Sequence, residues 1–393
     1  DMAHIVNDMG ETFEGKTVTQ QNDIDLSTVC SATLGNWTPI GDYSTNTNLY
    51  FAGTFEGNSK NISNIYINSN KEQQGLFGTS RGIIKNLGIE NGNINVYSTE
   101  MPGTGGIVAF VDAGGKVENC FNKANITGIR SVGGIAGSSV GKVTGCYNEG
   151  KVVGDNRVGG IVGDNSYNIG IGEVYNCYNA GDVSCSNYWG GGIVGCNYTK
   201  NITENCYNIG KMINNTGGIA GANANIIKNC YYLEGIASSG ITYIPDTSGQ
   251  AEAKYAVYMK SSDFVNVLNA GDNNWKLVEG KNNNFPVLSW EEWTATERES
   301  YAEYSNLDST GYDVYCYIGG EAKTKVEFPT WTKLNGQDDL KWYTAENLGN
   351  GIYHYRIKKS EHNNESGKYY THAWYSNSDG SKTLAGGFEC IVP

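Results

Sequence analysis

Two short phrases recur together between residues 75 and 232 of this chain, and they constrain its fold more than any other feature. The first is a glycine-bounded tetrad, which appears as GLFG, GIVA, GIAG, GIVG, GIVG and GIAG at intervals of 26 to 32 residues. The second has the form Asn-Cys-Tyr-Asn, and its five cysteines are 24 to 31 residues apart. A fixed phrase at slightly variable intervals indicates equivalent units joined by loops of unequal length, which is the pattern of a solenoid.

The residues around these phrases alternate between apolar and polar, as in GKVTGCYNEGKVV and GEVYNCYNAGDVS. A period of two predicts short strands, and glycine or asparagine interrupts the runs too often for a helix of ordinary length. Each unit then holds two or three strands separated by bends, and copies stack about 4.8 Å apart through parallel ladders. The sequence therefore predicts an all-β fold whose first part is a right-handed parallel β-helix.

Stacking of this kind places equivalent residues of successive coils over one another. The parity of the strands predicts a buried cysteine column of Cys120, Cys146, Cys177, Cys206 and Cys230. The next residues have the opposite parity, which predicts an outer aromatic stack of Phe121, Tyr147, Tyr178, Tyr207 and Tyr231. The residues before the cysteines predict an asparagine ladder at a bend, interrupted by Gly145, with the members Asn119, Asn176, Asn205 and Asn229.

The aromatic stack has two interpretations. Like side chains pack on neighbouring coils without any ligand, but aromatic faces also suit pyranose rings, so Tyr147, Tyr178 and Tyr207 are candidate sugar-binding residues. The cysteine column fits no metal site, because its spacing contains neither histidine nor a Cys-x-x-Cys pair. We expect no metal and no cofactor.

A catalytic set is hard to find in this sequence. It has four histidines (His4, His354, His362 and His372) and no H-E-x-x-H, G-x-S-x-G or P-loop motif. Some β-helices are polysaccharide lyases or glycosidases, which need carboxylates gathered on one face of adjacent coils. The best candidates for that chemistry are Asp155, Arg157, Asp164 and Asp182. Their offsets from the nearest tetrad differ, so we expect them to scatter over loops and the chain not to be an enzyme.

Charge and hydropathy exclude some classes of binding partner. A formal net charge of −13 and a pI near 4.8 oppose binding to nucleic acid or anionic lipid, which is attracted by lysine and arginine. No stretch approaches the ~18 apolar residues of a membrane helix, so we expect no direct membrane insertion. Richness in Asn, Thr, Tyr and Gly is typical of bacterial surface proteins, which favours an extracellular or cell-surface location.

Roughly residues 10 to 292 resemble the GLUG-motif repeats of bacterial surface proteins and of the stalks of some IgA-cleaving peptidases. The tetrads and the stretches GKTVTQQNDIDLS, WTPIG and FAGTFEGNSKNISNIYI carry this resemblance. The segment MKSSDFVNVLNAGDNNWKLVEGKNNNFPVLSW resembles the end of such arrays and predicts a helical cap, with Ser262 as N-cap and Gly271 ending the helix. We expect Trp275, Phe285 and neighbouring apolar residues to cover the last coil.

From about residue 299 the tetrads vanish and aromatic, alternating runs predict a small antiparallel sandwich. This part resembles the group B streptococcal Bsp-like repeat through VEFPTWT, GQDDLKWY, GNGIYHYRI and HNNESGKYYTHAWYSNSDG. The resemblance implies an immunoglobulin-like module that is common in surface adhesins and wall-associated hydrolases and has no established catalytic role. Trp331, Trp342 and Tyr343 are its candidate ligand-binding residues, with core packing as the alternative.

The first and last strands of such sandwiches often lie side by side, so Cys316 and Cys390 are a possible disulfide. The predicted domains are a β-helix over 1–245, a cap and linker over 246–298, and a sandwich over 299–393. We expect a non-catalytic adhesion or stalk protein whose partner is a glycan or protein of a host or microbial surface. The alternatives are a carbohydrate-active β-helix enzyme and an accessory region of a larger surface hydrolase or peptidase.

Overall fold

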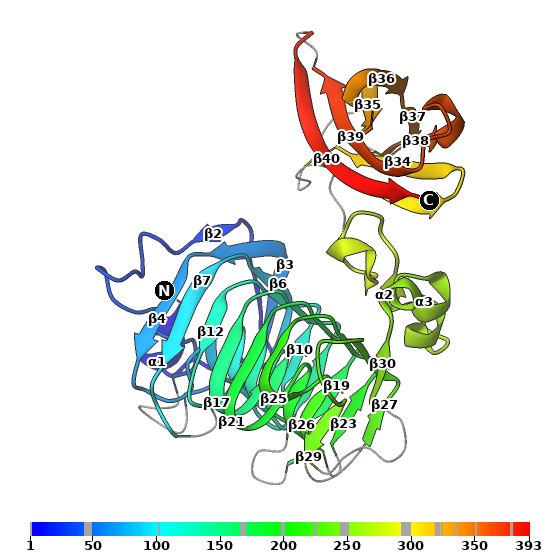
Figure 1. Ribbon diagram of the computed structural model, residues 1–393. Coiled ribbons are helices and arrows are strands. Elements are labelled where there is room, and N and C mark those ends of the chain that lie inside the picture. The colour runs from blue at the N-terminus through cyan, green and yellow to red at the C-terminus, as the bar shows by residue number, and fades with distance from the viewer. Residues whose placement is uncertain are drawn as a thin grey trace. The chain divides into compact units, whose positions relative to one another are not determined.

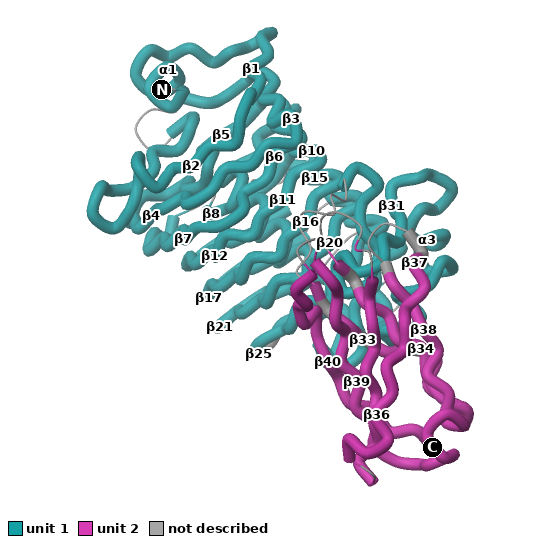
Figure 2. Tube along the Cα trace, turned by 90° about the horizontal axis from the view of Figure 1, so that it is seen from above, with its two compact units in different colours: residues 1–291 teal, residues 292–393 magenta. Residues whose placement is uncertain are grey.

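The computed structural model describes residues 2–42, 49–100, 103–165, 170–197, 201–223, 226–243, 251–291, 300–318, 323, 325–334, 336–349, 352–377 and 380–393. The chain divides into two compact units, residues 1–291 and residues 292–393, which are coloured separately in Figure 2. Both units are built from strands, and helices make up about 7% of the structure. The all-β prediction is confirmed. The domain boundaries predicted at 245/246 and 298/299 lie outside the described residues.

The first unit is a parallel β-solenoid of about six turns, whose coils follow one another from blue to green in Figure 1. The strands of its coils form three sheets, and β31 (Trp275–Lys276) and β32 (Val287–Leu288) form a separate antiparallel pair. The largest sheet contains β1 (Thr17–Thr19), β2 (Ile24–Asp25), β3 (Thr54–Ser63), β6 (Ile83–Ile89), β10 (Lys116–Glu118), β11 (Phe121–Asn122), β15 (Lys142–Thr144), β16 (Tyr147–Asn148), β19 (Glu173–Tyr175), β20 (Tyr178–Asn179), β23 (Ile202–Glu204), β24 (Tyr207–Asn208), β27 (Ile226–Lys228), β28 (Cys230–Leu233) and β30 (Ala251–Lys254). The second sheet contains β4 (Ile65–Ser69), β7 (Gly92–Val96), β8 (Thr104–Gly105), β12 (Asn125–Thr127), β13 (Arg130–Gly133), β17 (Val152–Gly159), β21 (Val183–Gly191) and β25 (Met212–Gly217). The third contains β5 (Phe77–Ser80), β9 (Val108–Val111), β14 (Ala136–Ser139), β18 (Val162–Asp164), β22 (Val194–Asn197), β26 (Ala220–Asn223) and β29 (Ile241–Tyr243).

The register of the coils follows the recurring phrases. Tyr147 pairs with Tyr178, and Tyr178 pairs with Tyr207, each through parallel strands. Val143 pairs likewise with Val117 before it and Val174 after it. Because the same kind of residue meets at most of these junctions, the apolar positions of one parity form buried columns inside the coil.

The two phrases are in contact within the four coils whose tetrads begin at Gly106, Gly134, Gly160 and Gly192. The last asparagine of the second phrase points inward, and the first glycine of the tetrad leaves room for it. A Cβ added at Gly134 would lie 2.4 Å from Cγ of Asn148, and one added at Gly160 would lie 2.4 Å from Cγ of Asn179. A larger residue at the glycine would therefore displace the asparagine, so each phrase needs the other.

These inward residues form an inner asparagine ladder of Asn122, Asn148, Asn179 and Asn208, all without solvent exposure. Nδ2 of Asn148 donates to Oδ1 of Asn179 at 2.8 Å, and Nδ2 of Asn179 donates to Oδ1 of Asn208 at 2.8 Å. Each amide also binds a carbonyl two residues further on, such as Gly181 O at 2.7 Å from Asn179 Nδ2. The ladder therefore satisfies polar groups that the narrow interior of the coil keeps from water.

Helical elements lie at the two ends of the first unit's sequence. Helix α1 (Met2–Asn7) precedes the first strands, and α2 (Ala256–Met259) and α3 (Ser262–Asn269) follow the last coil. Ser261, one residue before the predicted Ser262, is the N-cap of α3, and its side chain accepts from Phe264 N. The unit closes with β31 (Trp275–Lys276), the 3-10 helix η2 (Asn282–Asn284) and β32 (Val287–Leu288). We call residues 256–291 the cap. No helix among the described residues is long and apolar enough to span a membrane.

The second unit consists of two antiparallel four-stranded sheets. The first sheet has the order β33 (Tyr301–Asp308), β34 (Gly311–Tyr317), β38 (Ile352–Lys358) and β37 (Glu346–Gly349). The second has the order β36 (Gly336–Thr344), β35 (Val326–Thr332), β39 (Gly367–Ser376) and β40 (Lys382–Val392). A short 3-10 helix, η4 (Lys359–Glu361), follows β38. Tyr312, Phe328 and Tyr369 are buried in one core shared by residues of both sheets, which is the packing of a sandwich.

Candidate functional site

The aromatic residues that follow the column cysteines form a continuous stack. The ring centroids of Tyr147 and Tyr178 lie 4.9 Å apart, and those of Tyr178 and Tyr207 lie 5.2 Å apart. The ring planes of these pairs differ by 6° and 3°. Strand register alone imposes this geometry, because adjacent coils present the same side chain at the same height.

The stack is covered by the cap. Tyr178 and Tyr207 are 0% exposed and Tyr147 is 4% exposed, so a sugar cannot reach their rings in this structure. Phe264 meets Tyr207 edge-on at 6.0 Å, and Trp275 lies 5.3 Å from the same ring. This burial argues against a ligand-binding role for these three tyrosines and favours the packing interpretation of the stack. Strand parity separates the inside of a coil from its outside, but it does not say whether a later segment packs on the outside.

The cap lies along the flank of the solenoid, whereas its apolar residues were predicted to cover the last coil. At one end Asn229 Nδ2 donates to Val267 O at 2.7 Å. At the other end Trp290 stacks on Tyr147, which lies several coils earlier, and its Nε1 donates to Gly145 O at 2.8 Å. The flank offers a stack of aromatic rings, and the cap and these rings form one buried apolar cluster, which is favourable because it removes apolar area from water.

Buried polar groups fix the cap in place. Glu291 is 2% exposed and accepts from Tyr178 Oη at 3.3 Å and from Leu288 N at 2.7 Å. Its Oε2 also lies 3.2 Å from Lys281 Nζ. Burial raises the pKa of this carboxyl group, and the Lys281 ammonium opposes that shift. These contacts bond the Glu291 carboxylate to the solenoid and to the rest of the cap, and they leave it 2% exposed.

The predicted cysteine column is present inside the coil, where all five residues are 0% exposed. The backbone N of Cys146 donates to Sγ of Cys177 at 3.4 Å, and the same contact joins Cys177 N to Sγ of Cys206. Burial raises the pKa of the Cys206 and Cys230 thiols. Among the described residues no group of three or more His, Cys, Asp or Glu side chains is placed to hold a metal ion. The column packs the core.

The structure brings together two of the four residues considered for an enzyme site. Arg157 forms an ion pair with Asp164, whose side chain is 0% exposed. The expectation that these residues scatter over loops is therefore wrong for this pair. Asp155 instead accepts from Ser186 Oγ. Asp182 lies just before β21, is exposed, and its Oδ1 accepts from Lys211 N at 3.3 Å. Asp164 is neutralised by its arginine, so this pair is not the two-carboxylate arrangement of a glycosidase.

One of the module's three predicted ligand-binding residues lies in its core. Tyr343 is 8% exposed, and its hydroxyl is 2.9 Å from His362 Nε2. The other ring nitrogen of His362 is 3.1 Å from Asp339 Oδ2. This buried chain joins β36 to the turn after β38, which favours the core-packing interpretation of Tyr343 over a role in binding.

Trp331 and Trp342 lie on the opposite, outward face of the second sheet. Strand alternation places them there with Tyr370, His372 and Trp374, because their neighbours Phe328, Thr371 and Ala373 are buried. We call Trp331, Trp342, Tyr370, His372 and Trp374 the aromatic face. Trp331 and Tyr370 are directly paired across β35 and β39, and their rings stack at 5.7 Å with planes 20° apart. Trp342 is 49% exposed.

The predicted disulfide between Cys316 and Cys390 is not formed, and all ten cysteines are thiols. Cys316 lies on β34 of the first sheet and Cys390 on β40 of the second, so their strands do not pair side by side as predicted. Both side chains are buried in the sandwich core. Burial raises the pKa of Cys390 to about 12.

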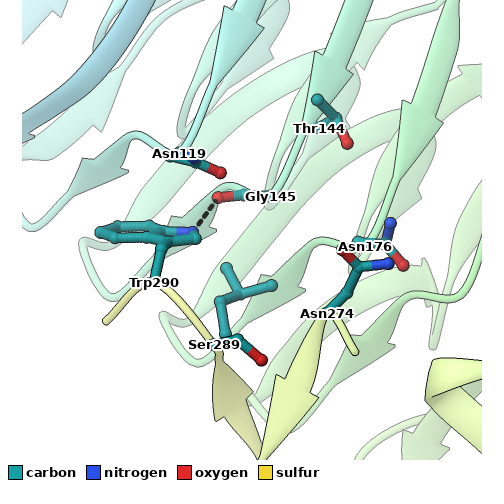
Figure 3. A pocket seen from close by; sticks show the side chains of 8 residues that line it. Asn119, Thr144, Gly145, Asn176, Asn274, Ser289 and Trp290 are labelled. Atoms are coloured by element: carbon teal, nitrogen blue, oxygen red, sulfur yellow. Dashed lines mark hydrogen bonds between the residues drawn. The ribbon is translucent and has the colours of Figure 1, made fainter. Parts of the chain in front are cut away.

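A pocket of about 200 Å³ lies where the cap meets the solenoid bend (Figure 3). Its lining is neutral and consists of Asn119, Thr144, Gly145, Asn176, Asn274, Leu288, Ser289 and Trp290. Figure 3 shows Trp290 and Asn119 on one side and Asn176 and Asn274 on the other. No sequence pattern indicates this pocket, because the cap residues that close it lie 98 or more positions after the bend residues.

Comparison with known proteins finds one family model that matches part of the chain. Residues 304–389 match the family model of the GBS Bsp-like repeat. This match confirms the resemblance of the second unit, and it covers no part of the solenoid. No curated protein matches the chain.

Two solved structures show a partial likeness. They are a polysaccharide deacetylase from Bacillus cereus, at 11% identity and a TM-score of 0.22, and a protein from Bacillus anthracis ascribed the same activity, at 13% identity and a TM-score of 0.21. Each comparison covers 24% of this chain and 30% of the other. Less than a third of either protein is therefore spanned, and similarity at this level carries no argument about activity.

Proposed function

We propose that this chain is a non-catalytic protein of the bacterial surface or exterior, in which the solenoid is a stiff stalk and the Bsp-like module binds a glycan. The glycan belongs to a host or microbial surface or to dietary polysaccharide. The family match at residues 304–389 supports a surface location, since the repeat is typical of surface proteins. The resemblance of the solenoid to GLUG-motif repeats supports the stalk.

The observation that carries the binding role is the aromatic face. Trp342 offers the most accessible ring, and Lys382 Nζ lies 4.6 Å above the ring centroid on the same sheet. Trp331 is held by Tyr370 on one side and by the edge of His372, whose ring centroid is 5.0 Å away. Aromatic residues held by their neighbours present apolar area at a small entropic cost on binding.

A flat aromatic sheet face suits a polysaccharide better than a compact ligand. The apolar faces of pyranose rings stack on aromatic rings, and adjacent strands space such rings along a chain-like ligand. Glu327, which sits in the same face, is paired with Lys325 and Lys382, so its charge is compensated. A neutral or weakly charged glycan is therefore the ligand that we expect.

The solenoid supports this role mechanically. Each coil is joined to the next by parallel ladders in three sheets and by the inner asparagine ladder. Load applied along such an array is shared by many hydrogen bonds at every junction. The buried cap adds side-chain contacts that cross several of these junctions at once.

Glycan-array binding of the complete chain tests the proposal. Trp342→Ala should abolish or strongly weaken the signal for glycans that the wild type binds. Tyr97→Ala is the matched control, because Tyr97 is an exposed aromatic of the solenoid (59%) remote in sequence from the module. A flat array for the wild type, or equal binding by Trp342→Ala, would overturn the role of the aromatic face.

The enzyme alternative rests on the Arg157–Asp164 pair, over which Trp189 places its ring 5.2 Å from the guanidinium carbon. Release of reducing sugar or unsaturated ends from polysaccharide, lost in Asp164→Asn, would favour that alternative. An accessory role within a larger hydrolase or peptidase would show as glycan binding by this chain without turnover. If the chain captures a host protein that carries no glycan, the partner is a protein and not a glycan.

A further inference from the structure

The pocket at the cap originates in a break of the outer ladder at the solenoid bend. Four residues of this bend column, Asn119, Asn176, Asn205 and Asn229, have φ between 51° and 55°. Gly145 occupies the same position in its coil with φ 62°. Asparagine is among the few residues with a side chain that tolerate this left-handed conformation, so the backbone does not require glycine here.

The missing side chain leaves amide groups without their ladder partners. Where the column is intact, Nδ2 of one residue donates to Oδ1 of the residue one coil earlier, as Asn229 does to Asn205 at 2.7 Å. Beside Gly145, Oδ1 of Asn119 accepts no hydrogen bond and the amide of Asn176 makes none, among the residues that the structure describes. The Oδ1 atom of Asn176 is buried and unpartnered too, although its ladder donor would be Nδ2 of Asn205 on the next coil and not residue 145. An unpaired buried amide oxygen is unfavourable unless a water or a ligand binds it.

The cap turns this gap into a walled pocket. Trp290 Nε1 donates to Gly145 O at 2.8 Å and so holds the indole against the gap (Figure 3). Leu288 contributes an apolar surface, and the Asn274 side chain has no hydrogen-bond partner within the described part of the chain. The pocket thus combines two apolar groups with three amides from Asn119, Asn176 and Asn274.

The lining defines the chemistry of a ligand. None of the eight lining residues is charged, so a charged ligand would lose its hydration without gaining a counter-charge. A volume of about 200 Å³ lies below the ~300–1,000 Å³ of pockets for drug-sized ligands. A small neutral ring with several hydroxyl groups matches both the size and the mixed lining.

We propose that this pocket binds a single neutral sugar unit, with the amides of Asn119, Asn176 and Asn274 bonded to its hydroxyl groups and Trp290 and Leu288 against its apolar side. This site is separate from the aromatic face of the module and does not depend on it. The solenoid then has a binding role of its own in addition to its role as a stalk.

Gly145→Asn is the sharpest test, because it restores the residue found at the equivalent bend of the neighbouring coils. The new Cβ would lie 2.5 Å from Oδ1 of Asn119, which is the movable end of a side chain, so the fold should accommodate it. The restored amide would fill the pocket. The variant should therefore keep the wild-type circular dichroism spectrum and thermal midpoint while losing the ligand.

The assay uses the whole chain carrying Trp342→Ala, so that the module does not contribute. Saturation-transfer NMR and Trp fluorescence would be measured with methyl glycosides of glucose, galactose, mannose and N-acetylglucosamine. We expect at least one glycoside to bind and Gly145→Asn to weaken it at least about tenfold, which corresponds to losing one hydrogen bond. Asn205→Ala is the matched control, because it removes an asparagine of the same column that does not line the pocket, and it should bind as before.

Two results would overturn the proposal: no glycoside binds, or Gly145→Asn binds as well as the parent. If Gly145→Asn fails to fold, Asn176→Ala and Trp290→Phe take its place, and unchanged binding in both contradicts the site. Binding here with a silent aromatic face would refute the proposed role of the module and leave this site intact. If Trp342→Ala alone abolishes all binding to glycan arrays, the role of the module is supported and the pocket site is refuted.

Discussion

The inner asparagine ladder offers the most direct test of how the recurring phrases stabilise the solenoid. Asn179 makes three hydrogen bonds: it accepts from Asn148 and donates to Asn208 and to Gly181 O, all at 2.7 to 2.8 Å. Asn179→Ala would leave one N–H of Asn148 and the carbonyl of Gly181 buried without their partner. At about 1–3 kcal/mol for each such group, the substitution should destabilise the solenoid by about 2–6 kcal/mol.

Guanidinium unfolding followed by circular dichroism would measure this loss as a lower midpoint. Asn266→Ala is the matched control, because Asn266 is exposed on α3 and its loss should change stability by no more than about 0.5 kcal/mol. The double variant with Asn148→Ala should cost less than the sum of the two single variants, since both remove the same bond. A loss below about 1 kcal/mol for Asn179→Ala, or strict additivity in the double variant, would refute the ladder as a stabilising network.

Three further predictions follow from burial and charge. Mass spectrometry without reductant should find ten thiols that iodoacetamide labels only after unfolding, and a mass lower by two hydrogens would instead indicate a bridge between Cys316 and Cys390. Tyr207→Ala should destabilise the cap by about 3–5 kcal/mol, as for other buried aromatic residues, and a thermal midpoint unchanged from wild type would contradict the packing seen here. Hydrogen bonds from Thr310 lower the pKa of Asp308 to about 2, so the stabilisation by this carboxylate is present above its unfolded pKa near 3.8 and is lost as pH falls toward 2. An NMR titration should show the Asp308 midpoint rising in Thr310→Ala, and a midpoint that stays near 2 would exclude the hydroxyl as its main cause.

Local sequence patterns predicted the solenoid well, because every coil repeats the same strand parity and the same residues at its bends. The parity around Cys146 and Tyr147 places one residue inside and one outside, and the spacing of the tetrads sets which residues pair. The αL conformation shared by Asn176 and Gly145 explains why glycine replaces asparagine at one bend. All of these are properties of a segment and its copies.

The candidate sites were harder to predict, because they depend on contacts between distant segments. The position of Trp290 against Tyr147 follows from how the cap packs on the flank, and no periodicity of the cap specifies that surface. Strand alternation was enough to separate outward Trp342 from inward Tyr343 once the strand was known, yet the two residues are adjacent and looked alike as candidates. The pocket required both the missing side chain of Gly145 and the cap, and only the folded chain shows them together.

The position of the cap on the flank limits how a solenoid of this kind can gain coils during evolution. Coils are chemically equivalent at their junctions, so duplication of one unit in a gene would extend the rod by about 4.8 Å without a new kind of contact. The cap covers a fixed number of coils, from the coil of Asn229 back to the coil of Tyr147. Its length therefore sets how many coils before it can be covered. Copies inserted on the amino-terminal side of those coils would leave their aromatic rings uncovered, and selection in longer homologues should replace those rings with polar residues.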